Sequence, residues 1–125
     1  MLDAIGIAAR DVDQTLEFYE LFNMDFQNYG EGHYEAKTAS GMRVMIDSFE
    51  LLKQINPNWK EPIASGVVLC FLQKTPEEVD LLVSKIKSAG FEVMKEPWDA
   101  FWGQRYASVI DPNGNQIDIF ATLEK

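Results

Sequence analysis

The chain has 125 residues, enough for one domain with a buried core and too few for two independent ones. Its net charge of −9 argues against nucleic acid as a partner, because phosphate binding needs clustered Lys and Arg. Since no apolar run approaches the roughly 18 residues of a membrane span and no leader is evident, we expect a cytoplasmic protein with no membrane partner. Cys70 is the only cysteine, which excludes an internal disulfide and a cysteine-based metal cluster.

The first half of the chain predicts a strand, a helix and three short strands. Residues 2–8 form an apolar run that is typical of a strand. Asp11 can cap the following helix, and Gln14, three residues later, can reach back to it. Three short strands joined by tight turns are then expected, over residues 25–29, 33–39 and 42–47. Module one therefore spans residues 1–48 as βαβββ.

The second half repeats this order after an irregular segment. Residues 49–65 contain the breakers Asn56-Pro57-Asn58 and Glu61-Pro62, and they predict a linker. Module two, residues 66–125, begins with a buried strand over 67–72. The helix after it has the strongest start signal in the chain, a capping Thr75 followed by a proline and by a Glu three residues later.

The end of module two combines an aromatic loop with a hairpin. A strand is expected over residues 91–96, followed by a loop with three large rings at Trp98, Phe101 and Trp102. Residues 105–110 and 116–120 flank Asp111-Pro112-Asn113-Gly114, a turn sequence, and therefore predict a β-hairpin.

The two halves can be aligned with each other by their glycine turns, Ser40-Gly41 with Asn113-Gly114. The equivalent positions are then Ala4 with Val68 and Met45 with Asp118. Because side chains alternate across a strand, one sheet face should be apolar and covered by the helices. The residues of that face are Ile5, Ile7, Val44, Ile46, Leu69, Phe71, Ile117 and Ile119. The opposite face mixes small, polar and apolar side chains, which suits either a cavity wall or a partner surface.

The duplicated βαβββ pattern, Phe18-Tyr19, Trp102-Gly103-Gln104-Arg105-Tyr106 and Asp111-Pro112-Asn113-Gly114-Asn115 together resemble the glyoxalase/bleomycin resistance/dioxygenase family, the vicinal oxygen chelate superfamily. The resemblance covers nearly the whole chain. It implies an α+β fold in which two βαβββ modules form a curved mixed sheet, a half-barrel, around a cleft. It also implies a homodimer, since a second subunit commonly completes that cleft.

Enzymes of this superfamily generally hold a divalent metal through His or Glu side chains from the first and last strands of each module. The matching positions here are Ala4, Met45, Val68 and Asp118, of which only Asp118 can be a ligand. Since a catalytic divalent site normally takes at least three protein ligands, we expect no metal and no other cofactor. The alternatives left open are a hard cation held with water by Asp47 and Asp118, and a ligand or general-base role for His33. His33 lies at a predicted turn or strand start, remote from the four positions, and we expect it to be a surface histidine.

Without a metal site, the resemblance points to members that bind a small molecule, such as the drug-sequestering bleomycin resistance proteins. The three large rings offer stacking surfaces worth about 0.5–1.5 kcal/mol each beyond burial, and the acidic balance favours a cation. Arg105 either pairs with an internal carboxylate or receives an anionic group of the ligand. No catalytic residue is assigned. The expected ligand-binding residues are Ala4, Met45, Asp47, Val68, Trp98, Phe101, Trp102, Arg105 and Asp118.

The sequence therefore predicts metal-independent binding of a small aromatic or cationic molecule by a homodimer, as in antibiotic resistance. Two alternatives remain: a metal-dependent lyase, isomerase or dioxygenase of the glyoxalase type, and a domain whose open face serves protein association. For Trp98 and Trp102, the alternative to ligand contact is packing under the sheet edge or at a dimer seam.

Overall fold

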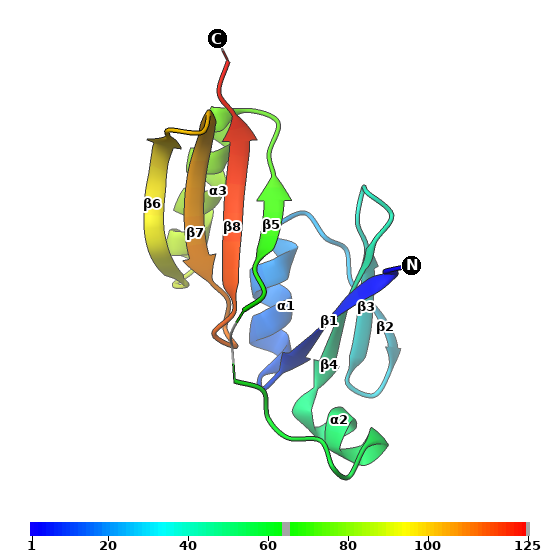
Figure 1. Ribbon diagram of the computed structural model, residues 1–125. Coiled ribbons are helices and arrows are strands. Elements are labelled where there is room, and N and C mark those ends of the chain that lie inside the picture. Colours follow the sequence, from blue (N-terminus) through cyan, green and yellow to red (C-terminus); the bar gives the residue numbers. More distant parts are fainter. Residues whose placement is uncertain (64–65, 125) are drawn as a thin grey trace. The chain divides into compact units, whose positions relative to one another are not determined.

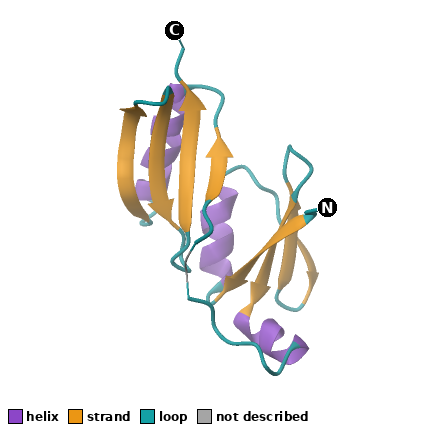
Figure 2. Ribbon diagram, in the orientation of Figure 1, coloured by secondary structure: helices purple, strands orange, loops and turns teal. Residues whose placement is uncertain are grey.

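The computed structural model describes residues 1–63 and 66–124, and the chain divides into two compact units, residues 1–63 and 64–125. The first unit contains β1 (Ala4–Ala9), α1 (Val12–Glu20), β2 (Gln27–Gly30), β3 (His33–Lys37), β4 (Arg43–Ser48) and α2 (Phe49–Ile55) (Figure 1). The second contains β5 (Leu69–Leu72), α3 (Pro76–Ser88), β6 (Glu92–Ala100), β7 (Gln104–Ile110) and β8 (Gln116–Thr122). The predicted α+β fold with a duplicated βαβββ order is confirmed (Figure 2).

Each unit is built on an open four-stranded mixed sheet rather than a closed barrel. The strand order is β1-β4-β3-β2 in the first sheet and β5-β8-β7-β6 in the second. In both, the first strand of the unit pairs in parallel with the last, and the remaining pairs are antiparallel. Among the described residues, none of the helices has the length and apolar character that a membrane crossing requires.

The strand registers confirm the internal alignment of the two halves. Gly6 lies opposite Met45 in the first sheet, and Cys70 lies opposite Asp118 in the second. These are equivalent pairs in the repeat, so Met45 and Asp118 occupy matching places on their sheets. The boundary of β5 differs from the prediction, because Val68 precedes the strand and is 40% exposed.

α1 begins at the capping residue that the sequence indicated. The Asp11 side chain accepts a hydrogen bond from the backbone N–H of Gln14 at 3.0 Å. Phe18 and Tyr19 are fully buried, with ring centroids 4.9 Å apart in an edge-on arrangement. They bring α1 onto its sheet, where Val44 and Ile46 are also buried, as predicted for the apolar face.

The expectation that residues 49–65 lack regular structure is wrong for their first half. Ser48 caps a short helix, α2, by accepting a hydrogen bond from the backbone N–H of Leu51 at 3.1 Å. Phe49 is buried, and its ring lies 5.1 Å from that of Trp59, centroid to centroid. The breakers that suggested a linker lie beyond this helix, so they end it rather than prevent it.

α3 has the capping box that its sequence predicted. The Thr75 hydroxyl accepts from the backbone N–H of Glu78 at 3.2 Å, and the Glu78 carboxylate accepts from the backbone N–H of Thr75 at 3.1 Å. The helix packs on one face of the second sheet, against β6, β7 and β8. The buried side chains of this layer include Val79, Leu82, Val83, Ile86, Val109, Ile117 and Ile119.

β6 is longer than predicted and contains one of the residues assigned to the aromatic loop. Trp98 lies within the strand and pairs with Tyr106 of β7, so only Phe101 and Trp102 belong to the turn between β6 and β7. The sequence underestimated β6 because Pro97 and bulges in its pairing interrupt the regular alternation.

The predicted hairpin between β7 and β8 is confirmed. The Asp111 carboxylate accepts hydrogen bonds from the backbone N–H groups of Asn113 and Asn115, both at 2.8 Å. Gly114 has a φ of 88°, which favours glycine because it has no Cβ. This turn fixes the register that places Tyr106 opposite Phe120 and Ser108 opposite Asp118.

Candidate functional site

Asp118 lies near the middle of β8, on the opposite sheet face from Ile117 and Ile119, and is 7% exposed. Its Oδ1 accepts from the Ser108 hydroxyl at 2.8 Å and from the Gln116 amide at 3.0 Å. Its Oδ2 accepts from the Tyr106 hydroxyl at 2.7 Å. All three donors are neutral, so they solvate the carboxylate without cancelling its charge.

A group of five rings, which we call the aromatic surface, adjoins Asp118: Trp98, Phe101, Trp102, Tyr106 and Phe120. The Trp102 ring lies 5.7 Å from Trp98, 4.9 Å from Phe101 and 5.4 Å from Tyr106, each edge-on, and Tyr106 stacks on Phe120 at 5.9 Å. Phe101 is 92% exposed and Trp102 48% exposed. The rings therefore form one continuous apolar surface that is open at its outer end.

Two polar contacts orient the tryptophans of the aromatic surface. The Trp102 indole N–H donates to the Gln104 amide oxygen at 2.8 Å. The Lys95 ammonium lies 5.0 Å from the centroid of the Trp98 ring, a cation–π geometry. One ring of the surface thus already receives a cation on its face.

The Tyr106 hydroxyl joins the aromatic surface to Asp118. Burial first, and then the hydrogen bond to the Asp118 carboxylate, raise the pKa of Tyr106 well above its usual range. The phenol therefore stays protonated and remains a donor to Asp118. The ring and its hydroxyl hold the carboxylate beside the stacked rings.

Arg105 lies on the other face of the second sheet and does not reach Asp118. Its Nε donates to Asp80 of α3 at 3.0 Å, and its Nη1 donates to Asp99 of β6 at 3.1 Å. The Asp80 hydrogen bond contributes most to raising the pKa of Arg105. The internal carboxylate that was one expected partner of Arg105 is not the partner found, because Asp80 and Asp99 are exposed carboxylates on the helix side of the sheet.

Two grooves, of about 360 and 460 Å³, flank the Arg105–Asp80 pair. Both are lined by side chains of α3, β6 and β7. The 360 Å³ groove includes Lys87 and Glu96, and the 460 Å³ groove includes Glu77 and the residues that follow β8. Neither groove is lined by a residue of the aromatic surface. The grooves and the aromatic surface are therefore separate features of this unit.

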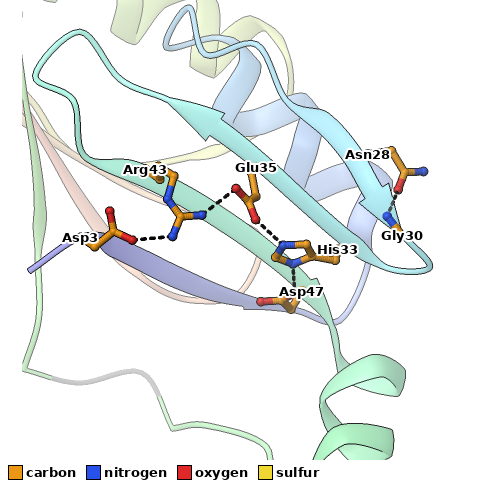
Figure 3. Close-up of polar contacts among 7 residues, drawn as sticks. All are labelled: Asp3, Asn28, Gly30, His33, Glu35, Arg43 and Asp47. Atoms are coloured by element: carbon orange, nitrogen blue, oxygen red, sulfur yellow. Dashed lines mark hydrogen bonds and ion pairs between the residues drawn. The ribbon is translucent and has the colours of Figure 1, made fainter.

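The open face of the first sheet carries a row of charged side chains in place of rings (Figure 3). Arg43 donates to Asp3 and to Glu35, each at 2.6 Å. The His33 ring lies between two carboxylates, with Nε2 2.7 Å from Glu35 and Nδ1 2.5 Å from Asp47. We call these five residues, Asp3, Glu35, Arg43, His33 and Asp47, the charged row.

His33 was expected to be a surface histidine remote from the repeat positions, and the structure instead places it two residues along the strands from the Met45 position. His33 pairs with Asp47 across β3 and β4, and its neighbour Glu35 lies opposite Met45. The histidine side chain is 26% exposed and both ring nitrogens contact carboxylates. The hydrogen bonds to Asp47 and then to Glu35 raise its pKa above the usual value.

The residues at the superfamily's metal positions do not fit a divalent metal. Ala4, Met45 and Val68 offer no hard donor, and both Asp118 oxygens accept hydrogen bonds from the protein. Among residues 1–63 and 66–124, no cluster of three or more His, Cys, Asp or Glu side chains is arranged to hold a metal. In the charged row the two carboxylates lie at opposite nitrogens of the His33 ring, which keeps them from converging on one ion.

The structure thus groups only some of the predicted ligand-binding residues. Trp98, Phe101, Trp102 and Asp118 come together in the second unit through Tyr106. Ala4, Met45 and Asp47 belong to the first sheet, and Val68 lies just before β5. The predicted approach of Asp47 to Asp118 stays a prediction.

The residues predicted for the site did not include Tyr106, Ser108 and Phe120. The signal was present, because the hairpin turn at residues 111–114 sets their register against Asp118. Glu35 and Arg43 were also missed as partners. Their signal is the alternation in β3 and β4, which places Glu35, Arg43 and His33 on one face.

A comparison with curated proteins finds no match. Among solved structures, the chain is similar to a glyoxalase/bleomycin resistance protein/dioxygenase family enzyme from Burkholderia phytofirmans PsJN, with 23% identity, a TM-score of 0.80 and 98% of each chain covered. It is also similar to a glyoxalase-related enzyme from Fulvimarina pelagi, with 16% identity and a TM-score of 0.85, over 98% of this chain and 88% of that one. A lactoylglutathione lyase from Agrobacterium tumefaciens matches with 17% identity and a TM-score of 0.71, over 97% and 92% of the two chains.

At these identities the solved structures establish a shared fold and nothing about chemistry. The family is established by sequence, because the family model described as "Glyoxalase/Bleomycin resistance protein/Dioxygenase superfamily" matches residues 1–119. The chain therefore belongs to the glyoxalase/bleomycin resistance protein/dioxygenase superfamily.

Proposed function

We propose that the chain binds a small planar molecule on its aromatic surface, without a metal. The observation that carries this proposal is the continuous path of rings from Phe101 through Trp102 and Tyr106 to Phe120, beside Asp118. A planar ligand that stacks on two of these rings gains about 1–3 kcal/mol beyond the burial of its apolar area.

The charge of the site favours a cationic ligand. Asp118 is 7% exposed and its hydrogen-bond partners are neutral, so its charge acts through a poorly screened environment. The Lys95–Trp98 contact shows that the face of one ring of this surface accommodates a cation. Sequestration of an antibiotic is the physiological use that we propose for such binding.

The donor set supports binding without a metal. A divalent ion at Asp118 would have to displace the Tyr106 and Ser108 hydroxyls from the carboxylate. The side chains of Ala4, Met45 and Val68 contain no oxygen or nitrogen atom that could coordinate the ion in their place. We therefore propose that Asp118 acts on a ligand through its charge and through the position of Tyr106.

The test compares two probes of nearly equal shape, N-methylacridinium, a permanent cation, and acridine, which is neutral near pH 7. Calorimetric titration in the presence of EDTA should give binding of both, with the cation the tighter. Asp118→Asn should weaken the cation more than the neutral probe. The matched control is Asp99→Asn, which removes the same charge from the opposite face of the sheet. Equal losses for both probes in Asp118→Asn would contradict the charge argument, and binding that appears only with added divalent metal would restore the enzyme alternative.

We also propose that the protein works as a homodimer. Apolar side chains near the edge strand β5 are unusually exposed, with Val67 at 73% and Leu72 at 67%. A second copy covering this edge would remove them from water. Light scattering on the purified protein should give twice the mass of one chain, and a monomer at micromolar concentration would contradict this proposal.

A further inference from the structure

His33 is the only histidine of the chain, and the structure places a carboxylate at each of its ring nitrogens. Nδ1 lies 2.5 Å from Asp47 Oδ1, and Nε2 lies 2.7 Å from Glu35 Oε2 (Figure 3). An ionised carboxylate has no proton to donate, so a hydrogen bond at each of these distances requires a proton on each ring nitrogen. The observed arrangement therefore requires the doubly protonated, cationic ring.

A neutral imidazole has one N–H and cannot keep both contacts. One carboxylate would then face a nitrogen lone pair, which is repulsive. The sheet must respond to the loss of one proton by giving up one of the two contacts. The surroundings of the two carboxylates decide which one is lost.

Glu35 has a second cationic partner and Asp47 has the closer contact. Glu35 Oε1 already accepts from Arg43 at 2.6 Å, so this carboxylate stays paired if it leaves His33. The Asp47 side chain is 15% exposed against 24% for Glu35, so it has less access to water as a substitute. Neutral His33 should therefore keep its Nδ1–H bond to Asp47.

We propose that His33 is a proton-controlled clasp on the open face of the first sheet. The cationic ring holds Asp47 and Glu35 together. When the ring loses the Nε2 proton, Glu35 turns to Arg43, and Nε2 becomes a hydrogen-bond acceptor that points onto the open face. The charged row changes from a net charge of −1 to −2 in this step.

The charged groups around His33 favour the protonated ring at low pH. Asp47 of β4 contacts the ring directly. Arg43, also of β4, contacts Glu35 and not the ring, and it pairs as well with Asp3, which precedes β1. β2 lies against β3 on the other side, where Gly30 is opposite His33 and contributes no side chain. The neighbouring Asn28 carboxamide accepts from the Gly30 N–H at 2.9 Å and is neutral. Within residues 1–63 and 66–124, the side chains that contact the His33 ring nitrogens are the two carboxylates, and they hold the ring in its cationic form.

The experiment is a pH titration of the His33 ring by NMR, with nitrogen and carbon labels in histidine. Since the chain has a single histidine, the signals need no assignment. The nitrogen chemical shifts report how many protons the ring carries and on which atom. We expect a midpoint above about 6.5 and, at high pH, a neutral ring protonated at Nδ1 rather than at Nε2.

Variants separate the two carboxylates. Glu35→Gln and Asp47→Asn should each lower the midpoint by about one unit, since each removes one negative charge at hydrogen-bond distance. Asp13→Asn, an exposed site in α1, removes the same charge away from the row and should leave the midpoint unchanged. Two outcomes would overturn the proposal. The first is a neutral wild-type ring that is protonated at Nε2 at high pH. The second is a wild-type titration midpoint no higher than those of Glu35→Gln and Asp47→Asn.

Discussion

Tyr106→Phe tests the link between the aromatic surface and Asp118. The change removes the hydroxyl that donates to Asp118 Oδ2 at 2.7 Å and keeps the ring that contacts Trp102 and Phe120. Asp118 keeps its bonds from Ser108 and Gln116. The difference in the free energy of unfolding between the wild type and Tyr106→Phe therefore reports one hydrogen bond to a buried carboxylate.

The magnitude follows from the charge and burial of the acceptor. A hydrogen bond to a charged group contributes about 1.5–3 kcal/mol, and Asp118 is 7% exposed, so we expect a loss of about 2 kcal/mol in the free energy of unfolding. With an unfolding entropy of about 2.1 cal/mol/K per residue, this lowers the Tm of a 125-residue chain by about 8 °C.

Urea denaturation followed by circular dichroism, together with calorimetry, measures this loss. The matched control is Tyr29→Phe, the same chemical change at a tyrosine that is 65% exposed in β2, where the loss should stay within about 0.5 kcal/mol. A double-mutant cycle with Asp118→Asn should give a coupling of about 1 kcal/mol. A Tyr106→Phe loss no larger than that of the control would contradict a stabilising bond to Asp118, because it would mean that the hydroxyl is equally well satisfied by water.

Three further predictions concern other parts of the chain. Trp102→Ala should abolish binding of N-methylacridinium in calorimetry while lowering Tm by only a few degrees, because the side chain is 48% exposed; a large fall in Tm would assign Trp102 to the core instead. The raised pKa of His33, due first to Asp47, stabilises the fold below the usual histidine pKa of about 6.5, and this contribution is lost as the pH rises through the folded-state pKa. His33→Gln should therefore flatten that part of the stability–pH curve, and an unchanged curve would contradict the assignment. Gly32→Ala should destabilise the first unit, since Gly32 has a φ of 76° and a Cβ there would collide with the Ser48 hydroxyl; a denaturation midpoint equal to wild type would show that the turn relaxes freely.

The sequence predicted those features of the fold whose causes are local. The capping box at Thr75 and Glu78, the cap at Asp11 and the Asp111–Gly114 turn each depend on residues within a few positions of one another. The duplicated pattern then placed Met45 and Asp118 at equivalent positions, which the strand registers confirm. α2 was not predicted, because it is short and the breakers that follow it are a stronger pattern in the sequence than its single capping serine.

The site was predicted less completely because its geometry depends on register and on side-chain direction. Trp98 was assigned to a loop since bulges in β6 hide the strand period, and this concealed its pairing with Tyr106. The direction of Arg105 is fixed by Asp80, which is 25 positions away in the chain and comes close only when α3 packs on the sheet. The two acids around His33 likewise meet it only through the pairing of β3 with β4.

The indole N–H signals of the protein are the most direct test of whether the aromatic surface binds a planar ligand without a metal. The chain has three tryptophans, of which Trp98 and Trp102 belong to the aromatic surface and Trp59 packs on Phe49 in the first unit. Two-dimensional NMR of protein labelled in its indole nitrogens, titrated with N-methylacridinium in EDTA, should shift the signals of Trp98 and Trp102 and leave that of Trp59 in place. No shift at saturating probe, or equal shifts of all three signals, would mean that the aromatic surface is not the binding site.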